Sequence, residues 1–106
     1  MSTVDVDIVE EIKIDEKVKR ETKEPSLYKV ILLNDNQTPI DWVIEVLTKI
    51  FKHTQEAAEK LTFEIHNEGS GIAGIYSHEI AEQKSTEALL SSREHGFPLQ
   101  IKMEQE

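Results

Sequence analysis

Three side chains that carry amide or carboxylate groups follow one another at Asn34, Asp35 and Asn36, directly after a short run of strand-forming residues. Thr38 is a good N-cap and Pro39 suits the first helical position, so a helix is predicted to begin immediately afterwards. The three side chains should therefore lie on a fixed ledge between two rigid elements. Their oxygen atoms accept hydrogen bonds, which suits a group that donates several, such as an ammonium group.

Ordinary turn chemistry is the alternative for this segment, because Asn and Asp side chains bond their own backbone in turns. It explains one or two of the three residues more easily than all three. His66 also has two interpretations. It can be a simple helix-terminal histidine favoured by the helix dipole, or it can fold back toward the ledge and accept one hydrogen bond from a bound ammonium group.

Other catalytic and metal chemistry has little support. His53, His78 and His95 lie in different segments without ligand spacing, and the chain has no cysteine. No nucleophile elbow and no phosphate-binding glycine loop is present in the sequence. Asp35 and His66 could form an acid–base pair, but no nucleophile accompanies them. We therefore expect no enzyme activity, no metal site and no cofactor.

The composition limits the class of partner. The chain has 106 residues, enough for one domain, and a net charge of -9 from 21 acidic and 12 basic residues. Nucleic acids and anionic membranes are poor partners for such a charge, whereas basic partners and free amines are favourable ones. No apolar run has the length of a membrane span and the N-terminus has no signal-peptide core, so a cytoplasmic protein is expected.

The chain divides into a charged N-terminal extension, residues 1–25, which we expect to be flexible, and a core domain, residues 26–106. An edge strand is the alternative for the alternating valines and isoleucines of the extension. In the core domain the expected elements are a strand at 26–33, a helix at 39–52, a helix capped by Thr54 and ended by Gly69, a strand at 71–76, a helix from Ser77 to about Arg93, and a strand at 98–103.

This order, β-α-α-β-α-β, predicts a two-layer α+β domain, a three-stranded antiparallel sheet with three helices on one face. Ile40, Val43, Ile65 and Leu99 are core candidates by periodicity. The charged residues at the start of the third helix have the pattern of a solvated face; they are Glu79, Glu82 and Lys84.

From about residue 25 to residue 102 the chain resembles the ClpS family of adaptor proteins. The resemblance rests on the run PSLYKVILLNDNQTP at 25–39, Val43, Val46-Leu47, His66, Gly69, Gly74-Ile75-Tyr76, Glu79-Ile80-Ala81-Glu82, Lys84 and Pro98-Leu99. It implies a compact domain of three strands and three helices. It also implies an adaptor without catalytic activity, which recognises N-degrons, proteins that begin with Phe, Tyr, Trp or Leu. The adaptor delivers them to a Clp AAA+ unfoldase and its ClpP protease.

The resemblance assigns roles to positions of this chain. It implies contact with the substrate α-amino group for Asn34, Asp35, Asn36 and His66. It implies a hydrophobic side-chain pocket formed by Leu32, Thr38, Ile40, Val43, Thr62, Ile65 and Leu99. It implies that Glu79, Glu82 and Lys84 dock the N-domain of a ClpA- or ClpC-type unfoldase, that the N-terminal extension hands over substrate, and that the protein is a monomer.

Three positions depart from the family pattern. Asn36 replaces the usual Asp, which removes a carboxylate and predicts weaker amine binding. Ile40 stands where Met is common, and its stiffer side chain should reject Ile and Val termini. Thr62 also replaces a common Met, so the pocket is larger or contains a hydroxyl group that needs a partner.

These departures keep a second function open, that of a regulator which docks on the unfoldase without loading N-degrons. A small hydrolase using Asp35 and His66, and a partner domain like that of the ribosomal stalk protein, are more distant alternatives.

Overall fold

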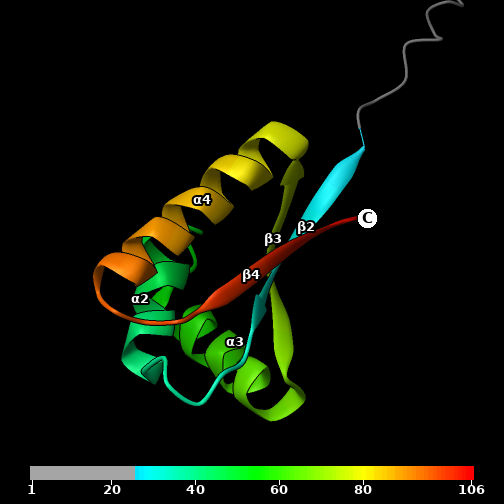
Figure 1. Ribbon diagram of the computed structural model, residues 1–106. Helices are drawn as coiled ribbons and strands as arrows, with labels where there is room; N and C mark the ends of the chain where they lie inside the picture. The colour runs from blue at the N-terminus through cyan, green and yellow to red at the C-terminus, as the bar shows by residue number, and fades with distance from the viewer. Residues whose placement is uncertain (1–25) are drawn as a thin grey trace, which may run out of the picture.

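A computed structural model describes residues 26–106 of the chain (Figure 1). The expectations for residues 1–25, a flexible extension or an edge strand, lie outside this range. The elements in chain order are β2 (Leu27–Leu33), α2 (Ile40–Lys49), α3 (Gln55–Glu68), β3 (Ser70–Ser77), α4 (His78–Glu94) and β4 (Gln100–Gln105). Each expected core-domain element is present.

The strands form a three-stranded sheet in the order β3-β2-β4, and β2 pairs antiparallel with both neighbours. Helix α4 packs against all three strands and α3 packs against β3. Figure 1 shows the helices gathered on one side of the sheet. The predicted two-layer α+β architecture is therefore confirmed.

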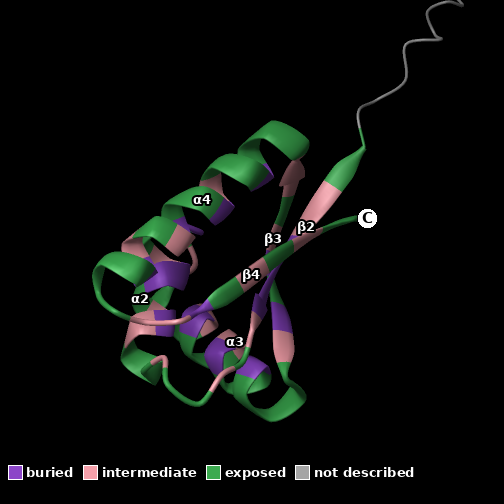
Figure 2. Ribbon diagram, viewed as in Figure 1, coloured by how far each residue is buried: buried purple, intermediate pink, exposed green. Residues whose placement is uncertain are grey.

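The core lies between the sheet and the helices. Val30 and Leu32, alternate residues of the central strand, are completely buried, and Val46 and Leu47 of α2 are buried against the same cluster. Figure 2 shows buried positions where the helices face the sheet. Full burial of each such side chain stabilises the fold by roughly 1.5–3 kcal/mol.

The two ends of α3 agree with the sequence prediction. The Thr54 hydroxyl accepts a hydrogen bond from the Ala57 backbone N–H, and Gly69 ends the helix with a φ of 94°. The carbonyl oxygen of Gly69 then accepts a hydrogen bond from the Asn34 backbone N–H at 2.9 Å. This bond joins the end of α3 to the end of β2.

A β-bulge interrupts the pairing of β2 with β3. The register shifts between Val30 and Ile31, and Ala73 is the residue of β3 without a register partner. The carbonyl oxygen of Ala73 lies 2.6 Å from His53 Nε2. Because a carbonyl can only accept, this ring nitrogen carries the hydrogen, and His53 holds the bulge in place.

The start of α2 differs from the sequence prediction. Pro39, not Thr38, is the N-cap, and no side chain caps the helix there. The Thr38 hydroxyl instead donates to Asp35 Oδ2 at 2.8 Å. Helix α2 begins at Ile40, whose side chain is 53% exposed, so the expectation that Ile40 belongs to the core is wrong. Ile40 lines an open cavity instead of packing in the core.

The loop between β2 and α2 folds around one carboxylate. Asp35 Oδ1 accepts hydrogen bonds from the backbone N–H groups of Gln37, at 2.8 Å, and Thr38, at 2.6 Å. Partial burial by itself raises the pKa of Asp35, but the Thr38 and Gln37 bonds together with the charge of Arg93 outweigh it and lower the pKa below 3.8. The turn-forming interpretation therefore holds for Asp35.

The last strand begins later than predicted, at Gln100 instead of Pro98. The Arg93 guanidinium donates to the carbonyl oxygens of Phe97, at 3.0 Å, and Leu99, at 2.7 Å. These bonds engage carbonyl groups of the connection, and Pro98 has no N–H for a strand ladder. The strand therefore begins at Gln100, directly after the last carbonyl group that Arg93 binds.

We expect Gly69→Ala to destabilise the protein by about 1 kcal/mol, because a Cβ is unfavourable at positive φ. A Cβ at this position would have no atom within 4 Å, so the loss would report backbone strain alone. Urea unfolding measures it. Gly96→Ala is the matched comparison, since Gly96 also has positive φ and open space. An unchanged midpoint for Gly69→Ala would contradict the assigned cap.

We expect Asp35→Asn to destabilise the protein at pH 7 by roughly 1–2 kcal/mol, because charge-assisted hydrogen bonds are lost. The folded-state pKa of Asp35 is lowered, so its contribution is present above the ordinary carboxyl pKa and is lost as pH falls through the folded value. The difference between wild type and variant should therefore shrink toward pH 3. Urea unfolding at pH 7, 5 and 3 tests this, with Glu64→Gln as a surface control. An equal deficit at all three pH values would contradict the role of the charge.

Candidate functional site

A cavity of about 230 Å³ lies where the end of β2, the start of α2 and the last turns of α3 meet. It has polar groups on one side and apolar groups on the other. Its lining residues are Asn34, Asp35, Asn36, Thr38, Ile40, Val43, Thr62, Ile65 and His66. All of them were selected from the sequence, and the fold brings them together from three separate segments.

The polar side of the cavity combines the β2–α2 loop with α3. Asn34 and Asn36 are exposed on the loop, and His66 is exposed in the last turn of α3. The backbone bond from Asn34 to Gly69 places the two segments side by side. His66 therefore lies at the same cavity as the ledge of amide groups.

Asp35 gives this side its negative charge. Its two oxygens accept three hydrogen bonds from the loop itself, whereas an ionised carboxylate has about four acceptor sites. The pKa of Asp35 is below the ordinary value, so the group stays charged at neutral pH. The carboxylate thus both holds the loop in shape and provides a fixed negative charge beside the cavity.

The apolar side is formed by the two helices. Val43 of α2 and Ile65 of α3 are buried, with 7% and 3% exposure, and Ile40 is half exposed. The position of Ile65 is restricted by Gly71 of β3, where a Cβ would come within 2.8 Å of Ile65 Cγ1. The backbone of β3 at Gly71 therefore lies close to the Ile65 side chain, and this contact positions a wall of the cavity.

Thr62 is the one polar residue on this apolar side that is buried, with 5% exposure. Its hydroxyl oxygen has no hydrogen-bond partner within residues 26–106. The wall of the cavity therefore encloses a polar oxygen among apolar neighbours.

Two residues that the sequence placed in the pocket do not line this cavity. Leu32 and Leu99, with 0% and 1% exposure, belong to the hydrophobic core. Leu32 lies on the inner face of the central strand, so its side chain supports the helices that form the cavity. Hydrophobicity alone does not distinguish a core residue from a lining residue.

The acidic face of α4 is only partly as expected. Glu79 and Glu82 are exposed and lie along a shallow groove of about 670 Å³ that includes Leu90. Lys84 does not belong to this solvated face. Its ammonium group donates to the Ile50 carbonyl oxygen at 2.8 Å and lies 5.5 Å from the centre of the Tyr76 ring, because residue 84 is on the side of the helix that faces α2.

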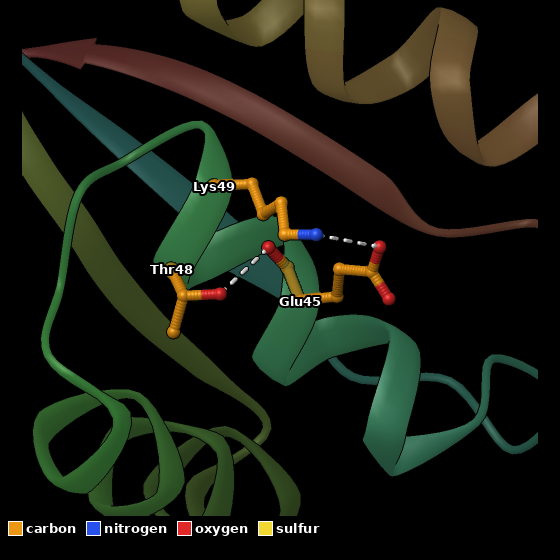
Figure 3. A network of polar contacts seen from close by, with 3 residues as sticks. All are labelled: Glu45, Thr48 and Lys49. Carbon is orange, nitrogen blue, oxygen red and sulfur yellow. Dashed lines mark hydrogen bonds and ion pairs between the residues drawn. The ribbon is translucent and has the colours of Figure 1, made fainter.

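A second groove, about 350 Å³, runs along the outer side of α2 and the start of α3. It contains none of the residues selected from the sequence. Figure 3 shows its polar contacts: Lys49 Nζ lies 3.6 Å from Glu45 Oε2, and the Thr48 hydroxyl donates to the Glu45 carbonyl oxygen at 3.1 Å. Both charged groups of the pair are largely exposed, so the pair contributes little to stability.

Sequence reasoning missed the backbone bond between Asn34 and Gly69, since a contact of this kind leaves no side-chain pattern.

Among residues 26–106, no group of histidine, aspartate and glutamate side chains is arranged to hold a metal ion. In the same range, no helix has the length and apolar character needed to cross a membrane.

Comparison with known proteins gives consistent matches. The family model described as ATP-dependent Clp protease adaptor protein ClpS matches residues 23–102. The chain is 46% identical over 88 residues to the ATP-dependent Clp protease adapter protein ClpS 2 of Bradyrhizobium diazoefficiens, covering 83% of this chain and 80% of the relative. It is 43% identical over 90 residues to the ClpS adapter of Parvibaculum lavamentivorans, covering 85% of this chain and 82% of the relative.

A solved structure is also similar. Agrobacterium tumefaciens ClpS2, bound to L-phenylalaninamide, superposes with a TM-score of 0.76 at 37% sequence identity, covering 78% of this chain and 100% of that one. The sequence matches span most of both partners, and the fold agrees. The chain therefore belongs to the ClpS family of ATP-dependent Clp protease adaptor proteins.

Proposed function

We propose that this protein binds the free N-terminal residue of proteins that begin with a bulky hydrophobic residue, Phe, Tyr, Trp or Leu. It delivers them to a ClpA- or ClpC-type unfoldase and the ClpP protease, in the cytoplasm and without catalysing a reaction itself. The observation that carries the proposal is the shape of the cavity, where hydrogen-bond acceptors adjoin an apolar wall. An N-terminal residue offers the matching pair of groups, an ammonium and a side chain.

The polar side suits the ammonium group. A free α-ammonium donates three hydrogen bonds, and the Asn34 and Asn36 amide oxygens and a neutral His66 nitrogen can accept them. Asp35 adds a charge of opposite sign. An acetylated terminus would cover these exposed acceptors without supplying the donors, at a cost of about 1–3 kcal/mol for each acceptor that the bound peptide buries. The amide at Asn36 makes this contact weaker than a second carboxylate would.

The apolar side suits a single large side chain. The cavity of about 230 Å³ is smaller than a pocket for a drug-sized molecule, about 300–1,000 Å³. Burial of apolar surface against Val43 and Ile65 contributes about 25 cal/mol per Å², so large side chains gain most. L-phenylalaninamide, bound to the A. tumefaciens relative, has both features, a free α-amine and an aromatic side chain.

Delivery requires a second surface. We place the docking of the unfoldase N-domain on α4, with Glu79 and Glu82 exposed on its groove. Lys84, tied to Ile50, contributes to this surface mainly by holding α4 against α2. In this proposal residues 1–25 take part in handing over the substrate, and the adaptor acts as a monomer.

Peptides that begin with Phe, Tyr, Trp or Leu should bind saturably in fluorescence anisotropy, and acetyl-Phe peptides should bind at least tenfold more weakly, because the amine contacts are lost. Binding should also weaken above about pH 8, where an α-amine loses its proton. His66→Ala should reduce affinity about tenfold, whereas His78→Ala on α4 should leave it unchanged. Equal affinity for free and acetylated peptides would refute the assigned amine site.

The double variant Glu79→Lys with Glu82→Lys should abolish binding to the isolated unfoldase N-domain, because the charge of the α4 groove is inverted. Affinity for the Phe peptide should be unchanged. Glu64→Lys, the same charge change at an exposed position of α3, is the control. Normal docking by the double variant would exclude this face. If the wild-type protein bound the unfoldase N-domain but bound none of the peptides, the result would favour the alternative function, a regulator that does not load N-degrons.

A further inference from the structure

Thr62 contains a polar group that the fold leaves unpaired. The residue is 5% exposed, and its hydroxyl oxygen has no hydrogen-bond partner in the described part of the chain. It lies in the wall of the cavity beside Val43 and Ile65. A buried hydroxyl without a partner is unfavourable, so a ligand that supplies the partner recovers the lost interaction.

The position of Thr62 relative to His66 indicates which part of a ligand can reach it. The two residues are four positions apart on α3, so they lie on one side of the helix and about 6 Å apart along its axis. His66 is exposed, whereas Thr62 is buried. In the proposed binding mode, a terminal residue whose amine lies at His66 would extend its side chain inward along this turn and bring the tip of an aromatic ring to the wall at Thr62.

We infer that Thr62 is a specificity-determining residue that makes the cavity prefer an N-terminal tyrosine to an N-terminal phenylalanine. The tyrosine phenol donates and accepts hydrogen bonds, and the threonine hydroxyl does the same. Phenylalanine has the same ring without this group and leaves the Thr62 hydroxyl unpaired. This inference rests on the proposed binding of N-terminal residues.

The Thr62 hydroxyl can move to meet such a ligand. Threonine on a helix occupies two χ1 rotamers, so the hydroxyl changes place without movement of the backbone. The competing partner is the carbonyl oxygen of Ala58, one turn earlier on α3, which a threonine can reach by the same rotation. If the Thr62 hydroxyl donated to the Ala58 carbonyl oxygen when a ligand is bound, Thr62 would not distinguish tyrosine from phenylalanine.

The test measures affinities of otherwise identical peptides that begin with Tyr or Phe, for wild type and for Thr62→Val, which keeps the shape and removes the hydroxyl. We expect the variant to bind the Tyr peptide about tenfold more weakly and the Phe peptide within about twofold of wild type. Thr62→Ser should retain the preference for Tyr. Ser85→Ala is the matched control, because Ser85 also has a buried unpaired hydroxyl but does not line this cavity.

A second measurement uses wild-type protein only and so does not depend on the folding of a variant. A peptide that begins with 4-methylphenylalanine has a side chain nearly equal in size to tyrosine and no hydroxyl. The wild type should bind the Tyr peptide about fivefold more tightly. Equal affinity for these two peptides, or equal loss of Tyr and Phe affinity in Thr62→Val, would overturn the inference while leaving the proposed function intact. No binding of any free terminus would overturn both.

Discussion

The backbone hydrogen bond between Asn34 and Gly69 is the contact on which the site depends. Gly69 ends α3 with a positive φ, which turns the chain directly into β3. Its carbonyl oxygen accepts from Asn34 at the end of β2. Two segments that are distant in sequence are thereby held side by side, and the cavity lies between them. A residue with a Cβ would be strained in this conformation, so the absence of a side chain is what permits the arrangement.

The loop that completes the cavity is rigid for a different reason. The loop has no regular backbone hydrogen bonds of a helix or strand. Three hydrogen bonds to the Asp35 carboxylate hold it in shape instead. The opposite wall is a regular helix packed on the sheet, with Ile65 held by the close approach of Gly71. A site formed from such fixed parts loses little conformational entropy when a ligand binds. This property fits the proposed function, in which the cavity distinguishes one kind of N-terminal residue from others.

Several positions where local sequence rules fail lie around the cavity. Thr38 is not the N-cap of α2, although its residue type favours that position, and its hydroxyl donates to Asp35 instead. Ile40 is half exposed although periodicity places it in the core, and Thr62 has a buried hydroxyl without a partner. Both ends of α3 follow the capping rules, whereas α4 begins after Ser77 without a side-chain cap. Departures of this kind are expected where a protein uses residues for binding at some cost in stability.

The sequence by itself determined the elements and their order, because periods of 3.6 and 2 residues, together with the caps at Thr54 and Gly69, depend only on local chemistry. It also identified the polar ledge and gave His66 two interpretations, and the family resemblance favoured the one in which His66 lies at the ledge. Only the tertiary structure decided which apolar residues line the cavity and which, like Leu32 and Leu99, fill the core. It likewise turned Lys84 away from the acidic face of α4. Both outcomes depend on how separate elements pack, and hydrophobicity and charge are the same for a residue on either side of a packed helix.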